Sequence, residues 1–142
     1  MSQSLAEATA ALTSPGAPFE IEEVEIRGVP TLTWKNAPPS LRAVLEGSRL
    51  HGEKTFLVYE DERLSFTDHW NAAARLARTM VEEWGVAMGD RVALAMRNLP
   101  VWSVSFWAAT TVGAVAVPLN AWWKGEVLAY GLSDSGSEFL FC

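Results

Sequence analysis

The chain has 142 residues, of which 49% are hydrophobic and 20% charged, which is the composition of a folded domain and not of a disordered chain. The formal net charge is −6 and no basic stripe exists to neutralise phosphates, which argues against nucleic-acid binding. The single cysteine, Cys142, excludes an internal disulfide and fits the reducing cytoplasm, where we expect the protein to reside.

The N-terminal part carries weak signals. Residues 1–18 are small and polar and end in Ser-Pro-Gly-Ala-Pro, which predicts a mobile tail with a helical turn over residues 4–12. Residues 19–29 alternate apolar and acidic side chains imperfectly and weakly favour a strand, whereas residues 30–40 are predicted to be irregular. We expect one domain over residues 19–142.

A helix and a hairpin are predicted next. Ser40 follows two prolines and is expected to cap a helix that starts at Leu41 and ends at His51-Gly52. Residues 55–66 predict two short strands around a charged turn at Glu60–Arg63.

The clearest helix follows, with Thr67 as its predicted N-cap and Asp68 at the positive end of the helix dipole. Gly85 is expected to end it. Apolar residues at spacings of three and four form one stripe, which should face a core. The stripe consists of Trp70, Ala73, Ala74, Ala77, Met80, Val81 and Trp84.

The rest of the chain alternates strands and helices. The predicted order is strand 91–96, helix 98–112, strand 114–117, helix 125–134 and strand 138–142. Asn98 is the expected cap of the first of these helices, and Gly113 its stop. Short apolar strands joined by single helices indicate a parallel sheet. The predicted fold class is therefore α/β, a parallel-sheet βαβαβ portion preceded by a helix and a β-hairpin.

The stretch Asn98–Trp123 contains no charged side chain, which raises the question of a membrane span. Gly113 and Pro118 divide it into a helix of about 13 residues and a strand of about five, and both are too short to cross hydrocarbon. A helix apolar on most faces, followed by an apolar strand, is what the middle of an α/β fold needs. We therefore expect no transmembrane segment.

Several motifs, in their order and spacing, resemble the N-terminal part of the adenylate-forming (AMP-binding) acyl-CoA synthetase family over roughly residues 40–142. These motifs are Leu64-Ser65-Phe66-Thr67-Asp68, Ala73-Ala74-Arg75-Leu76-Ala77, Gly89-Asp90-Arg91-Val92, Asn98-Leu99-Pro100-Val101-Trp102, and Gly113-Ala114 with Pro118-Leu119-Asn120. Two positions depart from the family pattern. Val101 stands where the family often carries an acid, and His69 stands where it prefers leucine.

The resemblance implies a two-step reaction. A carboxylic acid, here a fatty acid or a related carboxylate, is joined to ATP with release of pyrophosphate, and coenzyme A then takes the acyl group from the adenylate. ATP, coenzyme A and Mg²⁺ are the implied cofactors, with Mg²⁺ and basic groups stabilising phosphate charge.

The family's Ser/Thr/Gly-rich phosphate loop, which ends in Pro-Lys-Gly, is absent from this sequence. We assign no catalytic, cofactor-binding or metal-binding residue, and expect an incomplete N-terminal adenylation domain that is inactive by itself. Residues 131–138 hold two glycines and three serines but no lysine, and are expected to be a helix end and turn.

Other candidate constellations have plainer explanations. Ser65, Asp68 and His69 include the residue types of a hydrolase triad, but their positions fit the start of a helix better. His51 and His69 lack a nearby cysteine that would favour a zinc site. Cys142 has no visible activating partner, and we expect it to pack in the terminal strand.

The residues after Pro118 stay open to two interpretations. Trp122 and Trp123 follow a parallel strand, where α/β proteins bind ligands, so they are candidates for a pocket wall, although packing against the next helix is favoured. Asn120 is expected to hold the turn through its side chain. Two alternatives to the ligase are kept: a free-standing α/β nucleotide- or ligand-binding module, and a membrane-associated protein.

Overall fold

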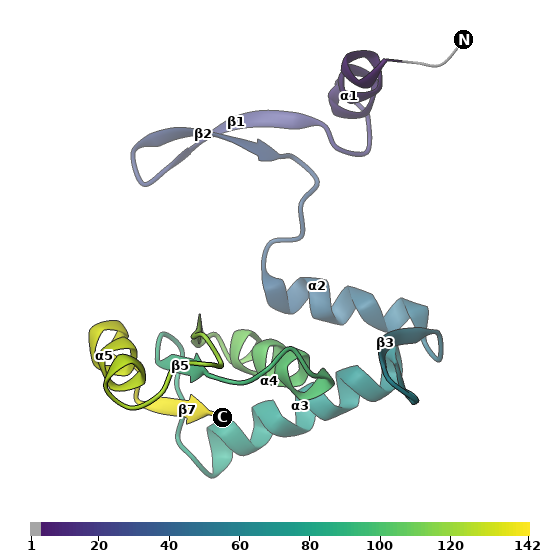
Figure 1. The fold of residues 1–142 in the computed structure, drawn as a ribbon. Helices are drawn as coiled ribbons and strands as arrows, with labels where there is room; N and C mark the ends of the chain where they lie inside the picture. Colours follow the sequence, from purple (N-terminus) through teal and green to yellow (C-terminus); the bar gives the residue numbers. More distant parts are fainter. Residues whose placement is uncertain (1–3) are drawn as a thin grey trace. The chain divides into compact units, whose positions relative to one another are not determined.

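The computed structural model describes residues 4–142, which divide into two compact units between Pro39 and Ser40 (Figure 1). The first unit contains helix α1 (Leu5–Thr13), which opens with a capping box between Ser4 and Glu7. The helical turn predicted over residues 4–12 is thus confirmed. Residues 1–3 of the predicted tail lie outside the described residues, and the mobility of residues 1–18 stays a prediction.

The first unit also contains an antiparallel hairpin of β1 (Ile21–Ile26) and β2 (Val29–Trp34). The prediction that residues 30–40 are irregular is therefore wrong for residues 30–34. The turn residues Arg27 and Gly28 have φ values of 52° and 80°, and two positive φ values give the turn twist that suits paired strands. Pro30 is tolerated because a two-stranded hairpin has only edge strands.

The second unit opens with α2 (Leu41–Ser48) and the short 3₁₀ helix η1 (Arg49–His51), so the predicted helix starts and ends where expected but its last three residues are 3₁₀ and not α. Ser40 Oγ accepts a hydrogen bond from the Ala43 amide at 3.1 Å, which confirms it as the cap. The predicted hairpin is also present, formed by β3 (Thr55–Tyr59) and β4 (Glu62–Ser65).

Helix α3 (Phe66–Glu82) starts earlier than predicted, because Ser65 and not Thr67 is its N-cap. Ser65 Oγ accepts from the Asp68 amide at 3.0 Å, and the Asp68 carboxylate accepts from the Ser65 amide at 3.1 Å. This reciprocal capping box satisfies two backbone donors at once, which a cap at Thr67 would not do.

The predicted stripe of α3 is correct in its middle and wrong at its end. Ala73, Ala77 and Met80 are buried, whereas Val81 and Trp84 are about half exposed. Val81 lies in the last turn of α3, and Trp84 lies beyond the end of the helix, where the helical spacing no longer fixes its direction.

A parallel sheet confirms the predicted fold class. Its strands β5 (Arg91–Leu94), β6 (Val115–Pro118) and β7 (Phe139–Phe141) lie in the order β6-β5-β7, and all pair in parallel. Helix α4 (Pro100–Thr111) joins β5 to β6, and α5 (Glu126–Ser135) joins β6 to β7. Strand β5 ends two residues before the predicted residue 96 because the chain turns toward α4.

Helices α3 and α4 pack side by side next to the sheet (Figure 1). Small residues on α4, together with the central strand, allow this close packing. The buried core consists of Ala77, Met80, Val86, Val92, Leu94, Ala108, Ala109 and Ala114. Among residues 4–142 no helix combines the length and the apolar character that crossing a bilayer requires.

Candidate functional site: a cleft at the carboxyl edge of the sheet

A cleft of about 430 Å³ lies where strands β5 and β6 end, between the loops that follow them. The first loop leads to α4 and so to β6, and the second leads through α5 back across β5 to β7. Right-handed crossovers, the rule for parallel strands, send two such connections to opposite faces of the sheet. The crevice between loops that diverge in this way is where open α/β sheets bind ligands.

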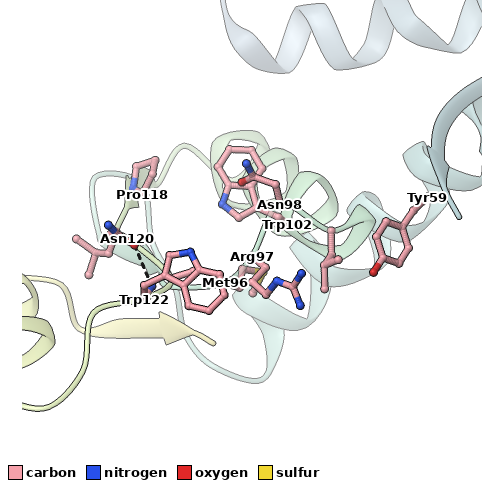
Figure 2. A pocket seen from close by; sticks show the side chains of 11 residues that line it. Tyr59, Met96, Arg97, Asn98, Trp102, Pro118, Asn120 and Trp122 are labelled. Atoms are coloured by element: carbon pink, nitrogen blue, oxygen red, sulfur yellow. Dashed lines mark hydrogen bonds between the residues drawn. The ribbon is translucent and has the colours of Figure 1, made fainter.

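Aromatic, amide and cationic side chains line this cleft (Figure 2). The loop after β5 provides Met96, Arg97 and Asn98, and the loop after β6 provides Asn120 and Trp122. Trp102 comes from the first turn of α4, and Tyr59 comes from the end of β3.

The loop after β6 is held by its own asparagine. Asn120 Oδ1 accepts a hydrogen bond from the Trp122 amide at 2.9 Å, and the Asn120 carbonyl accepts from the Trp123 amide at 3.0 Å. The predicted role of Asn120 in this turn is confirmed, and it is the turn that orients Trp122.

The two neighbouring tryptophans have different surroundings. The Trp122 side chain is 74% exposed and lines the cleft. The Trp123 ring lies against α5, where a Cβ atom added at Gly131 would be 3.0 Å from it. Packing against the next helix, which the sequence favoured for both, therefore holds for Trp123, while Trp122 takes the alternative position in the pocket wall.

Arg97 brings the positive charge of the cleft. Its guanidinium carbon lies 5.9 Å from the centre of the Trp122 ring, and its side chain extends between Trp122 and Tyr59 in the view of Figure 2. Within residues 4–142 it forms no salt bridge. An arginine without a carboxylate partner presents planar donors that match a carboxylate or a phosphate.

Asn98 does not cap α4, contrary to the prediction. The N-cap is Leu99, with no capping hydrogen bond from its side chain, and Pro100 occupies the first turn. The Leu99 amide donates to the Arg97 carbonyl at 2.7 Å, which makes Asn98 the middle residue of a tight turn. The amide side chain of Asn98 is thereby left to the cleft.

The residue types of a hydrolase triad do not form one. Ser65 and Asp68 are bonded to each other in the capping box, whereas Nε2 of His69 lies 3.0 Å from Ser103 Oγ on α4. Hydrogen bonds from Ser65 lower the pKa of Asp68, as expected for a capping carboxylate. The three residues have structural roles at the start of α3.

His69 is a buried contact between two helices. It is 1% exposed, and the edge of its ring meets Phe56 at a centroid distance of 4.7 Å. Burial lowers the pKa of His69, and hydrogen bonding to Ser103 opposes part of that shift. The imidazole is therefore a neutral packing group.

The remaining candidates add no site. Cys142 is exposed, so the predicted packing of its side chain in the terminal strand is not seen. Residues 131–138 form the end of α5 and a turn at Gly136, as predicted. Among residues 4–142 no cluster of three or more His, Cys, Asp or Glu side chains could hold a metal ion.

The cleft has several members that the sequence analysis did not place in a pocket, and Arg97 and Tyr59 are among them. Arg97 follows β5 directly, so the rule that ligands bind beyond the carboxyl ends of parallel strands would have found it. Tyr59 reaches the cleft from the β3–β4 hairpin, and no local pattern indicates that contact.

A three-stranded parallel sheet with helical crossovers and a cleft at its carboxyl edge defines an α/β protein with a candidate ligand site. Residues 45–142 match the family model described as "AMP-binding enzyme", and the chain belongs to this family.

Its similarity to known members covers only part of their length. The chain is 33% identical over 112 residues to the medium/long-chain-fatty-acid–CoA ligase FadD6 of Mycobacterium tuberculosis, covering 77% of this chain and 19% of FadD6. It thus spans about a fifth of that relative.

Solved structures are likewise matched over only part of their length. The inhibitor-bound N-terminal domain of FACL13 from Mycobacterium tuberculosis superimposes with a TM-score of 0.64 at 31% identity, covering 71% of this chain and 26% of that one. O-succinylbenzoate coenzyme A synthetase from Bacillus subtilis, in complex with AMP, gives a TM-score of 0.64 at 30% identity, covering 68% and 25%.

Proposed function

We propose that this chain is the N-terminal portion of an AMP-forming acyl-CoA ligase that acts in the cytoplasm on fatty acids or related carboxylates. Membership of the AMP-binding enzyme family is the observation that supports this class of reaction. The similarity to FadD6, whose name gives medium- and long-chain fatty acids as substrates, supports the substrate class.

The proposed reaction needs two transfers. A carboxylate oxygen of the acid attacks the α-phosphorus of ATP, the bond to the β-phosphate oxygen breaks, and pyrophosphate leaves. The thiol sulfur of coenzyme A then attacks the acyl carbon, its proton is lost, and AMP departs with the electron pair. Mg²⁺ would stabilise negative charge on the phosphates.

The described residues suit binding and not bond breaking. The cleft has a cation, two amides and aromatic rings, of which that of Trp122 is exposed, but no side chain with a base next to a nucleophile. None of these residues is assigned to Mg²⁺, because among residues 4–142 no group of three or more His, Cys, Asp or Glu side chains could hold a metal ion. In the proposal, residues 19–142 belong to the adenylation domain, and residues 4–18 form an N-terminal extension.

A ligand-binding module remains the second candidate. Residues 40–142 form a compact unit with its own core, and the cleft lies entirely within it. Such a module would bind a nucleotide or an organic acid at the carboxyl edge of the sheet without converting it.

Pyrophosphate release separates the two candidates. The product of the complete gene is incubated with ATP, Mg²⁺, coenzyme A and one acid at a time: acetate, octanoate, palmitate or O-succinylbenzoate. A ligase gives acid-dependent pyrophosphate, with AMP and acyl-CoA in equal amounts and the highest rates for fatty acids. Binding of an acid or a nucleotide without pyrophosphate from any acid would refute the ligase and favour the module.

A further inference from the structure

The β1–β2 hairpin belongs to a unit that has no buried core. None of residues 4–39 is buried, although they form a compact unit with α1 (Figure 1). A two-stranded hairpin is at best marginally stable in water, and chains below about 40 residues usually need a disulfide, a metal or a partner surface. The unit contains no cysteine. A partner surface is therefore the support that the hairpin requires.

One face of the hairpin gathers large apolar side chains and carboxylates. Residues directly opposite each other in an antiparallel pair share a face, and successive residues of a strand alternate between faces. The cross-strand pairs of one face, which we call the Trp34 face, are Ile21–Trp34, Glu23–Leu32 and Glu25–Pro30. All six residues are exposed, Leu32 at 70% and Trp34 at 62%.

The apolar end of the Trp34 face is hollowed. A depression of about 230 Å³ lies among Ile21, Leu32, Thr33 and Trp34. This volume is below the roughly 300–1,000 Å³ that small-molecule sites occupy, so the depression fits a protruding side chain of a partner surface and not a cofactor. Tryptophan is also one of the residues that most often dominate the binding energy of protein interfaces.

The other end of the Trp34 face is acidic. Glu23 and Glu25 form no salt bridge within the described part of their unit, whereas Glu20 is paired with Lys35 at 2.8 Å. A surface that covers these two carboxylates must bring positive charge, because burying an unpaired carboxylate is costly. The complementary surface is therefore apolar at one end and basic at the other.

Charge and size decide among the possible occupants. Each of the two units of this chain carries three more acids than bases, so a second copy would meet like charge. The face has six residues, whereas a stable interface between separate proteins takes about 20–30 residues from each. A partner in the same polypeptide needs a smaller contact, because a short covalent link gives an effective concentration on the order of millimolar.

From these observations we propose that the Trp34 face docks on a basic and apolar surface of the same polypeptide, formed by residues outside 4–142. The inference rests on the proposed function, in which this chain is one portion of a longer ligase. The similarity to FadD6, of which the chain covers 19%, supports that length. The hairpin lies outside the family match over residues 45–142, so this contact is an addition to the shared fold.

Cysteine labelling of the complete gene product tests the contact. Leu32→Cys and Val29→Cys are prepared separately, since these side chains are 70% and 60% exposed, lie on one strand and belong to opposite faces. The rate of maleimide labelling at each position is measured by peptide mass spectrometry and divided by its rate in urea. Docking should slow the labelling of Leu32→Cys by about tenfold or more relative to Val29→Cys, because labelling then requires local opening.

Matched charge variants test the chemistry of the partner surface. Glu23→Lys, added to Leu32→Cys, should restore most of the labelling rate, because it places a cation against a basic surface. Glu22→Lys is the control, since Glu22 is paired with Thr33 on the opposite face and the change in net charge is the same. It should leave the labelling of Leu32→Cys slow.

The outcomes separate the possible explanations. Equal normalised rates for Leu32→Cys and Val29→Cys would overturn the proposal. Protection that is lost on dilution, with a matching change of size in gel filtration, would also overturn it, because a second copy would then cover the face. Equal effects of Glu23→Lys and Glu22→Lys would contradict a basic partner surface.

The same preparations distinguish this inference from the proposed function. Pyrophosphate release by an enzyme with equal labelling rates at the two positions refutes the docking alone. Protection of Leu32→Cys as proposed, without pyrophosphate from any acid, refutes the ligase alone.

Discussion

The buried histidine of α3 gives a direct test of the packing between α3 and α4. Nε2 of His69 bonds to Ser103 Oγ at 3.0 Å, and its ring is covered by Phe56. The perturbation is His69→Leu, which keeps a side chain of similar size and removes the titratable group.

At pH 8 two effects of His69→Leu oppose each other. The hydrogen bond to Ser103 is lost, at a cost of about 1 kcal/mol. Burial of a leucine in place of a polar ring gains a similar amount, because full burial of such a side chain is worth about 1.5–3 kcal/mol. We therefore expect the free energy of unfolding to change by less than about 1 kcal/mol.

At pH 5 the variant should be clearly more stable than the wild type. Burial lowers the pKa of His69 below the ordinary histidine value of about 6.5, so the unfolded chain binds a proton at a pH where the native ring is still neutral. This contribution to stability is complete above pH 6.5 and is lost as the pH falls below it. If the native ring stays neutral, the loss at pH 5 is about 2 kcal/mol. Leucine has no such dependence.

The assay is urea unfolding of the wild type and the variant at pH 8, 6.5 and 5. Groups that titrate in both proteins cancel in the difference, which should grow steadily toward low pH. His51→Leu is the control, since the other histidine of the chain is exposed. Parallel stability curves for the wild type and His69→Leu would show that the imidazole is not buried between the helices, and would refute the reasoning.

Two further substitutions test helix ends. Gly113 has φ +84° after α4, so Gly113→Val should lower the free energy of unfolding by about 2 kcal/mol or more. The atom nearest to an added Cβ is Met88 Cγ at 2.9 Å, in a residue that is 85% exposed and can move, so Met88→Ala should not rescue the variant in urea unfolding. Rescue would contradict a backbone origin of the cost. Ser65→Ala should cost about 1 kcal/mol in the same assay through loss of the α3 cap, whereas Thr67→Ala should cost less, and the reverse order would contradict the observed capping box.

Periodic patterns in the sequence predicted the second unit well. The stripe around Ala73 and Met80 extends along a helix of 17 residues, and repetition of its spacing averages out local exceptions. The strand Arg91–Leu94 has only 4 residues and was predicted from its apolar composition after a turn. The N-cap of α3 was harder to predict, because Ser65 and Thr67 are both suitable residue types. Only the reciprocal hydrogen bonds between Ser65 and Asp68 decide between them.

Features that depend on a single local signal or on long-range contacts were predicted less well. The β1–β2 hairpin was missed because Arg27-Gly28 is not a favoured turn pair and Pro30 disfavours a strand. In the cleft, Asn120 could be predicted from its own turn, while the approach of Tyr59 depends on how the β3–β4 hairpin packs. That packing is set by tertiary contacts that no short stretch of sequence contains.

The uncharged stretch Asn98–Trp123 now has a physical explanation in two parts. The later turns of α4 place Ala108 and Ala109 in the core, where small side chains let the helix approach the sheet and α3. The two ends of the stretch, at Asn98 and Trp122, meet again at the cleft because both follow the carboxyl ends of neighbouring parallel strands. A charge at the buried positions of the helix would have no partner, so the lack of charge in the middle of the stretch serves folding.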